Sequence, residues 1–468
     1  MRNKNKWFIY VKGLLTVLPF IIGFIGFINL EGVSWSWAAY YAIRLYGLNT
    51  DVSEINSLIE FARWTAPIVT ASAILLIFKN LLVAGKNRIR AFREDSCSVY
   101  GEGEDVELML KNLGNSGIRG NLEKPVPSKH HILMLDDYER VMEFFNRERK
   151  LFVRDCDQGD GSSKRHGMLH ARVKDISGMA VQHDHMTAFS MEENCSMLYW
   201  KKYGAKQGEK IAIIGDTVLC DALLEQGFLV NILSLNQNIA YHVWEPESRF
   251  EKLHLRTKEM IEMTGDSLNT YISDWKDEIE LIGTMDRVIL CGNISSNLVN
   301  ASILLDMVPN VNIHMYARQA ESIKSFLNSE RVSCFGREEE LLTREVIIKA
   351  SLTQTAKQIH KHYSSKYQGL PSWEGLSTFQ RRSNMAAASY FSVIRKLNEE
   401  GVDLETLTEL EHIRWCRFYY MYNWQYGAVK DWNCRTHPSL IPFHELSREE
   451  KDKDKENVLL ALSDDFVL

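Results

Sequence analysis

Side chains suited to binding a nucleotide gather near the carboxyl-terminal end of the chain. Aromatic rings offer faces on which a purine stacks, and such stacking contributes about 1–3 kcal/mol per base. Basic and imidazole side chains supply hydrogen-bond donors for phosphate and ribose oxygens. The candidate ligand-binding residues are Trp415, Trp424, Tyr426, Arg414, Lys430 and His437, with Arg417 as a further basic side chain. The competing interpretation places the two tryptophans in a protein core.

A second candidate site follows a short apolar strand expected at residues 97–100. Gly101 and Gly103 form a Gly-x-Gly turn before an amphipathic helix, which is how a dinucleotide-binding unit begins. Asp136 follows the next strand, expected at 131–135, where an acidic residue can hold a ribose. The pattern predicts a first Rossmann-like unit with a cofactor site at these three residues.

Three residues oppose cofactor binding at that turn. Val106 stands where the pattern has its third glycine. Glu102 and Glu104 lie where a pyrophosphate would approach the helix N-terminus, and like charge repels it there. We therefore expect this unit to be degraded as a nucleotide site.

The sequence offers little support for catalysis or for a metal site. It contains no G-x-S-x-G, H-E-x-x-H or P-loop pattern. Glu411 and His412 are adjacent on an expected helix, so they point to different sides and form no dyad. The Gly-, Ser- and Asp-rich segment 156–172 is typical of a loop. Its neighbourhood holds histidines and aspartates without metal-ligand spacing: His166, His170, Asp155, Asp157 and Asp160. We expect neither an enzyme nor a bound metal.

Helices must position the carboxyl-terminal aromatic and basic residues. Apolar residues at three- and four-residue steps predict a helix at 404–422. An Asn-Trp-Gln-Tyr-Gly segment and a His-Pro-Ser-Leu-Ile-Pro-Phe segment follow it, and the next helix is expected at 447–462. Ser447 caps this second helix, with Glu450 three residues on.

This order of elements resembles the ryanodine-receptor repeat domain, called the RyR domain. The matching residues are Glu411, His412, Trp415, Trp424, Tyr426, Gly427, His437, Pro438, Leu440, Pro442, Phe443 and the lysines between 451 and 455. Phe443 stands where the family has Tyr, and Asn423 where it has Gly. The resemblance covers roughly 373–461 and implies an adenine-nucleotide-like ligand, including NAD-like and cyclic ADP-ribose-like molecules.

Between these two regions, strands alternate with helices, which predicts a second parallel, doubly wound sheet. The expected strands are 210–215, 227–235, 287–292 and 311–316, and the expected helices are 216–226 and 296–306. Gly215 stands alone after its strand, without a Gly-x-Gly pattern. Ser234 and Asn236, rather than a carboxylate, are expected at the end of the second strand. The sheet is therefore predicted without a cofactor site.

The first ninety residues are expected to form a membrane hairpin. Residues 13–30 carry no charge, and residues 65–84 carry only Lys79, which can reach the interface through its apolar stem. Basic segments flank both spans, which places both termini in the cytoplasm of a two-pass inner-membrane protein. A cleaved signal peptide is disfavoured, because the first apolar run is too long and a second run follows.

The loop between the spans is rich in aromatic residues and offers a candidate pore. Trp35, Trp37, Tyr40 and Tyr41 suit either an interfacial helix or a re-entrant helix that leads into Tyr46 and Gly47. Helix, re-entrant loop, helix is the layout of a two-span potassium-channel subunit, whose TVGYG carbonyls strip the ion of water. Only the Tyr46–Gly47 pair remains here, and an interfacial helix without a pore is the equal alternative.

Composition limits the functions expected of the part of the chain that follows the second span. The chain has 468 residues and a formal net charge of -6, which gives no electrostatic basis for binding nucleic acid. Its eight cysteines form no C-x-x-C pair, and all of them follow the second expected span. This usage is typical of reduced thiols in a cytoplasmic domain rather than of disulfides or zinc ligands.

Two spans, a basic connector and two Rossmann-like units together resemble membrane proteins that carry a potassium-transport regulatory module of the TrkA-N, or RCK, kind. The resemblance covers roughly residues 1–365 and implies ligand-driven gating by a homo-oligomer, most often a tetramer. The predicted fold is thus a membrane α-helical hairpin, tandem doubly wound α/β units and a small helical RyR-type domain. The expected boundaries are 1–93, 94–205, 206–368 and 369–468.

We therefore expect a protein embedded in the lipid bilayer whose cytoplasmic domains sense a nucleotide-derived ligand. Ligand binding would open an ion path or disturb the bilayer, as in a bacterial stress or anti-phage defence effector. The alternative is a non-conducting, nucleotide-binding regulatory subunit of a cation transporter. A NAD-dependent oxidoreductase is disfavoured, because both glycine patterns are degraded.

Overall fold

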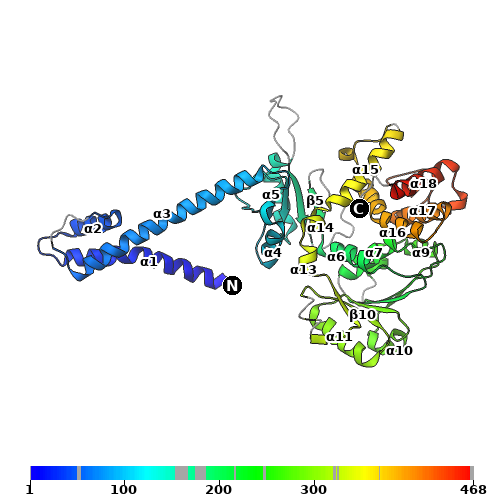
Figure 1. Ribbon diagram of the computed structural model, residues 1–468, viewed down its shortest axis with the longest axis horizontal. Helices are drawn as coiled ribbons and strands as arrows, with labels where there is room; N and C mark the ends of the chain where they lie inside the picture. The colour runs from blue at the N-terminus through cyan, green and yellow to red at the C-terminus, as the bar shows by residue number, and fades with distance from the viewer. Residues whose placement is uncertain are drawn as a thin grey trace. The chain divides into compact units, whose positions relative to one another are not determined.

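The computed structural model divides the chain into two compact units, Met1–Arg90 and Ala91–Leu468. Figure 1 shows the order of the elements along the chain. The residues that the structure describes are 2–49, 54–152, 167–173, 186–215, 218–245, 249–319, 323, 326–367 and 369–463.

The first unit is helical. Its elements are α1 (Arg2–Ile28), α2 (Trp35–Arg44), the 3-10 turn η1 (Leu45–Gly47) and α3 (Ser57–Ala91). Small residues let these helices approach closely, and its buried core is formed by Phe27, Ala38, Ala42, Leu45, Ile59, Ala62 and Ala66. A Cβ atom on Gly26 would lie 2.8 Å from Cγ1 of Ile59, so this glycine permits the contact between α1 and α3. Asn56 fixes the same contact, because its Nδ2 donates to the Gly26 carbonyl oxygen at 2.7 Å.

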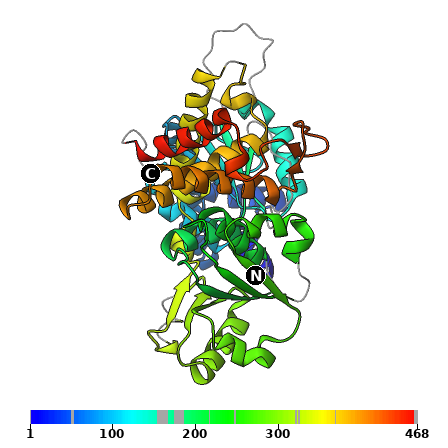
Figure 2. The same ribbon diagram turned by 90° about the vertical axis from the view of Figure 1, so that its right-hand side faces the viewer.

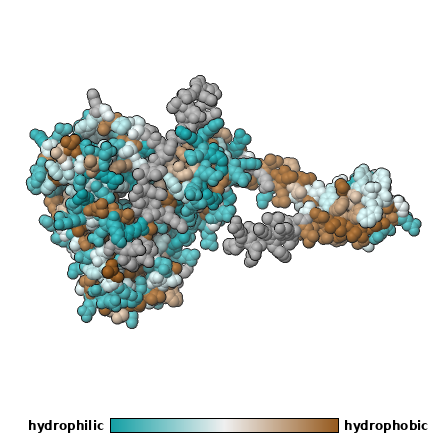
Figure 3. Space-filling model, turned by 180° about the vertical axis from the view of Figure 1, so that it is seen from behind, coloured by the Kyte–Doolittle hydropathy of each residue, from teal (hydrophilic) through white to brown (hydrophobic). Residues whose placement is uncertain are grey.

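One helix among the described residues, Ser57–Ala91, is long and apolar enough to cross a membrane, and Leu14–Ile28 is a shorter apolar helix. The rest of the described chain buries none of the apolar window of α3. Figure 3 shows hydrophobic residues gathered on the surface of this unit. One such helix does not establish a membrane hairpin, so the two-span topology remains a prediction.

The second unit begins with a five-stranded parallel sheet in the order β2-β1-β3-β4-β5. Its strands are β1 (Cys97–Tyr100), β2 (Gly117–Arg119), β3 (His130–Leu133), β4 (Met168–Arg172) and β5 (Met186–Phe189). The accompanying helices and 3-10 turns are α4 (Glu104–Leu113), η2 (Gly114–Ser116), α5 (Tyr138–Arg147), η3 (Arg149–Leu151) and α6 (Met191–Lys202). The order 2-1-3-4-5 is one of the two common doubly wound arrangements.

A six-stranded parallel sheet follows, in the order β11-β10-β9-β6-β7-β8. Its strands are β6 (Lys210–Ile214), β7 (Ala240–Trp244), β8 (Ser267–Tyr271), β9 (Arg287–Leu290), β10 (Asn312–Tyr316) and β11 (Val332–Phe335). Its helices and turn are α7 (Val218–Val230), α8 (Arg249–Leu253), α9 (Thr257–Glu262), η4 (Trp275–Glu278), α10 (Ile279–Ile282), α11 (Ile294–Met307) and α13 (Glu338–Leu341). Counted along the chain, the order is 3-2-1-4-5-6, the other common doubly wound arrangement. The prediction of tandem parallel α/β sheets is confirmed.

The structure corrects the strand predicted at 227–235. Helix α7 continues to Val230, and residues 231–234 form no strand. Phe228 is fully buried and packs its ring 4.9 Å from that of Tyr241, so this apolar stretch covers the sheet instead of joining it. A continuous apolar run does not by itself distinguish a buried helix from a buried strand. The second strand of the sheet is β7.

The predicted loop at 156–172 is also wrong at its end. Residues 168–172 form β4, which pairs in parallel with β3 and β5 and lies inside the first sheet. The loop composition comes from the residues before 167, which lie outside the described part of the chain. The strand itself carries buried Leu169 and Ala171, as a central strand requires.

The carboxyl-terminal region is mainly helical. Its elements are α14 (Arg344–Ile348), α15 (Ala350–Lys366), η5 (Trp373–Gly375), α16 (Thr378–Glu399), α17 (Leu404–Met421), β12 (Gln425–Tyr426), β13 (Thr436–His437), η6 (Phe443–Glu445) and α18 (Arg448–Leu462). The two helices predicted here are α17 and α18. Side chains cap both of them: Asp403 accepts from two backbone N–H groups of α17, and Ser447 accepts from Glu450 N at 3.3 Å.

A buried arginine docks these helices onto the second sheet. The Arg417 side chain of α17 has no exposed surface, and its Nη2 donates to Asp266 at 2.6 Å and to Thr264 at 2.5 Å. Its Nε donates to the Met260 carbonyl oxygen at 3.0 Å, and its Nη1 to that of Phe228 at 3.1 Å. Figure 2 shows α16 to α18 (orange to red) against the green elements of the second sheet. Arg417 is therefore a docking residue, not a phosphate contact.

We expect Arg417→Met to lower the free energy of unfolding by about 3–5 kcal/mol, because it leaves the Asp266 carboxylate buried without its counter-ion. Urea unfolding of the full-length protein in detergent, followed by tryptophan fluorescence, measures the loss. Arg448→Met removes an exposed arginine of the same region and serves as the control, with an expected change within about 0.5 kcal/mol. Equal effects of the two changes would contradict the docking role.

Candidate functional site

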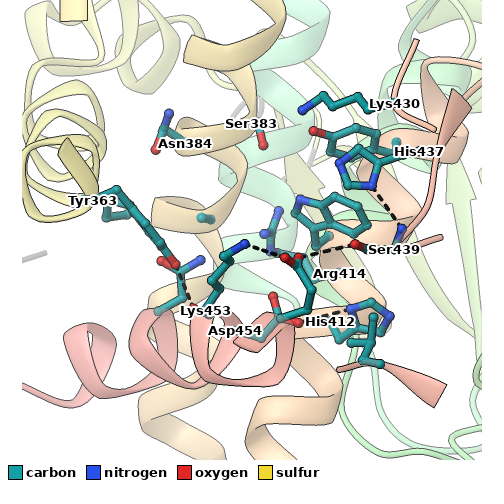
Figure 4. A pocket seen from close by; sticks show the side chains of 17 residues that line it. Tyr363, Ser383, Asn384, His412, Arg414, Lys430, His437, Ser439, Lys453 and Asp454 are labelled. Atoms are coloured by element: carbon teal, nitrogen blue, oxygen red, sulfur yellow. Dashed lines mark hydrogen bonds and ion pairs between the residues drawn. The ribbon is translucent and has the colours of Figure 1, made fainter. Parts of the chain in front are cut away.

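A polar cavity of about 280 Å³ lies among α15, α16, α17, α18 and the turn that contains β13. Figure 4 shows Lys430 and His437 on one side of this space and Tyr363 and Asn384 on the other. We call this cavity the RyR pocket, by the resemblance of the segment that forms most of it. Five of its polar lining residues come from different elements: Tyr363, Asn384, Arg414, His437 and Asp454.

Two buried polar atoms at the RyR pocket have no partner among the described residues. Arg414, 1% exposed, forms a two-pronged ion pair with Glu411, with Nε–Oε2 2.8 Å and Nη2–Oε1 2.7 Å. Its Nη1 has no acceptor. Asn457 donates its Nδ2 to Glu411 at 3.0 Å, and its Oδ1 has no donor. An unpaired buried polar group costs about 1–3 kcal/mol, so each atom favours a partner from outside the chain. The pocket thus offers one cationic donor and one neutral acceptor.

His412 lines the RyR pocket and is held as an imidazolium. Its Nδ1 lies 3.1 Å from Asp454 Oδ2, and its Nε2 lies 2.9 Å from the Ile441 carbonyl oxygen. Both neighbours are acceptors, so both ring nitrogens must carry hydrogen. Burial opposes the charge, but Cys416 and Asp454 raise the pKa of His412 to about 11. The charge of Asp454 is thereby neutralised within the chain.

His437 and Lys430 present hydrogen-bond donors of different charge. The Ser439 N–H donates to His437 Nδ1 at 3.1 Å, which leaves the ring hydrogen on Nε2. Burial, with the nearby charge of Lys430, lowers the pKa of His437 to about 4, so the ring is neutral at pH 7. Lys430 lies with Nζ 5.2 Å from the Trp432 ring and has no carboxylate partner among the described residues. Its ammonium group remains available to an anion.

Trp415 provides the aromatic wall of the RyR pocket. Its ring lies 4.2 Å from that of Tyr419, and the His437 ring meets it edge-on at 4.9 Å. The indole is half-buried, so part of its surface faces the cavity. A planar base can stack on such a ring.

The structure brings four of the six candidate residues together. Arg414, Trp415, Lys430 and His437 all line the RyR pocket. Trp424, 2% exposed, does not; its ring stacks on Phe379 at 5.4 Å, which makes it a core residue. Tyr426 lies on β12 with 60% of its surface exposed and also stands outside the lining.

Other lining residues were missed from the sequence. Asp454 and Asn457 face the RyR pocket from α18, and Asn384 faces it from α16. A signal for Asn457 exists, because it shares one helical face with buried Val458 and Ala461, where a polar residue is unusual. No local pattern marks Asn384.

The residues of the first candidate cofactor site lie together at the carboxyl edge of the first sheet. Gly101 (φ 131°) permits a close approach, because a Cβ atom there would lie 2.9 Å from the Met134 carbonyl oxygen. Gly103 is the N-cap of α4. Asp136 lies 2.9 Å from Nε of Arg172 and forms an ion pair with it. The carboxylate predicted to hold a ribose is therefore engaged within the chain.

Arginines also engage the helix start at this edge. Arg172 Nη1 donates to Asp105 Oδ2 at 2.7 Å, and Arg318 donates to the other oxygen of Asp105. Asp105 is the second residue of α4, where a bound phosphate would receive backbone hydrogen bonds. The chain thus places its own carboxylate, with two arginine partners, at the anion position.

The second sheet corrects the residues expected after its second strand. Ser234 and Asn236 follow α7, whereas the second strand, β7, ends before Glu245, a carboxylate. Glu245 lies near Asp221 of α7, which has a 1% exposed side chain and an ion pair to Arg249 at 3.1 Å. Burial, together with the charge of Glu245, raises the pKa of Asp221 to about 7. A buried acidic pair therefore occupies this edge, beside Gly215.

The candidate pore residues are part of the helical packing in the first unit. Tyr46 and Gly47 belong to η1, and the Tyr46 hydroxyl donates to the Thr16 carbonyl oxygen at 2.7 Å. Helix α2, which precedes them, packs on α1. The helix–short helix–helix order matches the predicted layout, and the pore itself remains a prediction.

Of the histidines and aspartates considered as metal ligands in the sequence, only His170 lies in the described part of the chain. His170 lies in β4 and is buried, with Nε2 3.1 Å from His130 Nδ1 and Nδ1 2.8 Å from the Thr187 hydroxyl. Burial lowers its pKa, as for a neutral core histidine. Asp155, Asp157, Asp160 and His166 lie outside the described residues. The described part of the chain holds no group of three or more His, Cys, Asp or Glu side chains placed to bind a metal.

The geometry defines a multidomain α/β protein whose carboxyl-terminal helices enclose a polar pocket. Residues 396–463 match the family model of the RyR domain. This segment runs from the end of α16 through α18 and contains Arg414, Trp415, Lys430 and His437, so the predicted RyR domain is confirmed. No curated protein matches the chain, and no solved structure matches it. The resemblance of the two sheets to TrkA-N units remains a prediction.

We expect Asp221→Asn to raise the melting temperature at pH 8 and to have little effect at pH 4. The raised pKa of Asp221 means that the fold prefers the protonated acid, so its contribution to stability is complete below about pH 4 and is lost as the pH rises through about 7. Asparagine resembles the protonated form at every pH. Thermal unfolding at both pH values measures the difference. Equal destabilisation at both would show that the ion pair with Arg249 dominates.

Proposed function

We propose that this chain is a membrane-anchored receptor whose RyR pocket binds a nucleotide-derived ligand. The observation that carries the proposal is a pair of donors, the unpaired Arg414 Nη1 and the Lys430 ammonium, which has no carboxylate partner among the described residues, beside the half-buried ring of Trp415. A phosphorylated nucleoside combines a negative charge with a planar base, and so it satisfies all three groups.

The other groups of the RyR pocket favour the same ligand class. The unpaired Asn457 Oδ1 accepts from an exocyclic amine or a ribose hydroxyl, and His437 Nε2 donates without adding charge. The volume of about 280 Å³ is just below the range for small-molecule sites, which is about 300–1,000 Å³. It supports one nucleotide moiety inside the pocket, with the rest of an NAD-like or cyclic ADP-ribose-like ligand outside it.

Ligand binding acts, in this proposal, on an oligomer of membrane hairpins built from α1 and α3. A ligand shifts such an equilibrium only by its different affinities for the two states. The exposed apolar surface of α3 supports the anchor, and the resemblance to two-span channels supports the oligomer. The output is an ion path or a disturbed bilayer, which suits a stress or defence effector in a bacterial inner membrane.

One observation favours a second function, the non-conducting regulatory subunit. The Tyr46–Gly47 pair lies in a 3-10 turn whose tyrosine hydroxyl is bonded to α1 of the same hairpin. A filter instead presents backbone carbonyls to an ion. In this case the ligand would regulate a separate transporter through the same RyR pocket.

Ligand binding is tested by thermal unfolding of the full-length protein with AMP, ADP, ATP, NAD and cyclic ADP-ribose. We expect one of these nucleotides to stabilise the fold, by about 2.7 kcal/mol at a concentration of 100 times Kd. Lys430→Ala removes an exposed, uncompensated charge and should weaken binding about tenfold, equivalent to about 1.4 kcal/mol.

Two matched variants control this experiment. Lys455→Ala removes an exposed lysine of α18 outside the pocket lining, and Tyr426→Ala removes an exposed ring outside it. Both should bind the nucleotide as the unchanged protein does. The proposal fails if no nucleotide stabilises the protein, or if Lys430→Ala binds as tightly as Lys455→Ala.

Ion flux separates the two functions. Protein reconstituted in potassium-loaded liposomes should release the ion when the stabilising nucleotide is added, and Lys430→Ala should require about tenfold more nucleotide. Nucleotide binding without any flux would instead identify the regulatory subunit. Membrane fractionation of the expressed protein tests the anchor separately.

A further inference from the structure

A second and larger cavity, of about 800 Å³, lies at the amino-terminal edge of the second sheet. Its walls are α6 and the segment after it, the starts of β9 and β10, the region of α14 and α15, and one side of α16. Doubly wound sheets bind nucleotides at the opposite edge, outside the carboxyl ends of the strands. We call this cavity the basic cleft, and its position is not one that the fold reserves for a cofactor.

Cationic side chains outnumber acidic ones in the basic cleft. The lining contains Arg287, Lys201, Lys202, Lys206, Lys349 and Lys396, against the two carboxylates of Glu209 and Glu345. Burial lowers the pKa of the lining residue His314 to about 3, so its ring is neutral at pH 7. The excess of positive charge therefore comes from lysine and arginine alone.

Three of these cations are already paired. Arg287 is 6% exposed and binds Glu209, with Nη2–Oε2 2.7 Å. The Lys349 ammonium lies 3.0 Å from Glu193, and the Lys396 ammonium lies 3.8 Å from Glu400. All three cations therefore have a carboxylate partner within the chain.

Three exposed lysines remain without a carboxylate partner among the described residues. Lys201 and Lys202 end α6, and Lys206 follows in the next segment. Lys202 lies with Nζ 5.0 Å from the ring of Tyr203, which also lines the cleft. Uncompensated lysines on one wall attract a ligand with more than one negative charge.

Part of the lining of the basic cleft is apolar. Leu198, Val230, Leu233, Leu352 and Val393 line it from four different parts of the chain. None of these side chains offers a hydrogen bond, so this part of the lining favours an apolar or aromatic body. A volume of about 800 Å³ is within the range of sites for organic ligands, about 300–1,000 Å³.

We propose that the basic cleft is a second ligand site, which binds an organic molecule with an apolar body and at least two negative charges. Lys201, Lys202 and Lys206, which have no carboxylate partner among the described residues, would contact the charges, and the aliphatic lining residues would contact the apolar body. Phosphates, sulfonates and carboxylates share this chemistry. The proposal is independent of nucleotide binding in the RyR pocket.

Helix α16 separates the two cavities. Asn384 and Ala387 line the RyR pocket, whereas Ala388, Ser392 and Val393 line the basic cleft. The two sites share a wall but no lining residue, so variants can address each of them alone.

The test uses pyranine, a fluorescent aromatic trisulfonate, titrated into full-length protein in non-ionic detergent and followed by anisotropy. The unchanged protein should bind pyranine, and binding should weaken in high salt. The triple variant Lys201→Glu, Lys202→Glu, Lys206→Glu should lose at least about tenfold in affinity. The control variant Lys111→Glu, Lys124→Glu, Lys252→Glu makes the same charge change at exposed positions outside the cleft and should bind as before.

Ser392→Trp provides a second variant that changes no charge. Ser392 is an exposed lining residue, so a tryptophan there should fill the basic cleft and exclude the probe. Asn398→Trp places the same ring on an exposed position of α16 outside the lining and should not affect binding. If the triple lysine variant fails to fold, this pair decides the question.

Three outcomes would contradict the proposed second ligand site. Absence of pyranine binding by the unchanged protein overturns the proposal. Equal losses in the two lysine triples show attraction by net charge alone and overturn it also. Loss of pyranine in Lys430→Ala, with retention in Ser392→Trp, would place the probe in the RyR pocket and reject the second site. Failure of nucleotide binding in the RyR pocket leaves this test unaffected.

Discussion

The arrangement of the carboxyl-terminal region depends on the buried guanidinium of Arg417. Its donors reach Asp266, Thr264 and two backbone carbonyls, so α17 is fixed to the second sheet by contacts that leave little freedom in angle. Removing a charge of this kind from water is costly unless its donors are satisfied, and here Nε, Nη1 and Nη2 all donate to acceptors outside α17. The ion pair between Arg417 and Asp266 thus specifies one docking position for α17.

The residues around Arg417 on the same helix explain why that position matters. Arg414, Trp415 and Tyr419 project from α17 into the RyR pocket, within one turn of the docking arginine. Helix α16 is fixed in the same way, because the buried Tyr390 hydroxyl donates to the Ile232 carbonyl oxygen at 2.5 Å. A change in the pocket that moves α17 must therefore strain its contacts with the sheet. This coupling gives the pocket a physical connection to the rest of the second unit.

Local signals in the sequence were sufficient to predict a helix that has its own caps and its own apolar stripe. Helices α17 and α18 begin after Asp403 and Ser447, within a residue of their expected limits. They were insufficient where tertiary packing decides the secondary structure. Residues 227–235 were predicted as a strand, but 227–230 belong to α7, which covers the second sheet. The RyR pocket was found in part, because Arg414 and Trp415 share a helix. Asn384 was not predicted as a lining residue, because only the docking of α16 brings it near the other lining residues.

The first sheet shows why a sequence pattern for a cofactor can persist without the cofactor. Gly101 is required by the backbone itself, because β1 and the segment after β3 approach too closely for a side chain. Asp136 has a partner in Arg172, which also pairs with Asp105 at the start of α4. Positive charge from Arg172 and Arg318 thus balances carboxylates that would repel a phosphate. The glycine and the aspartate are both accounted for by folding, so their presence argues for a doubly wound fold and not for a bound dinucleotide.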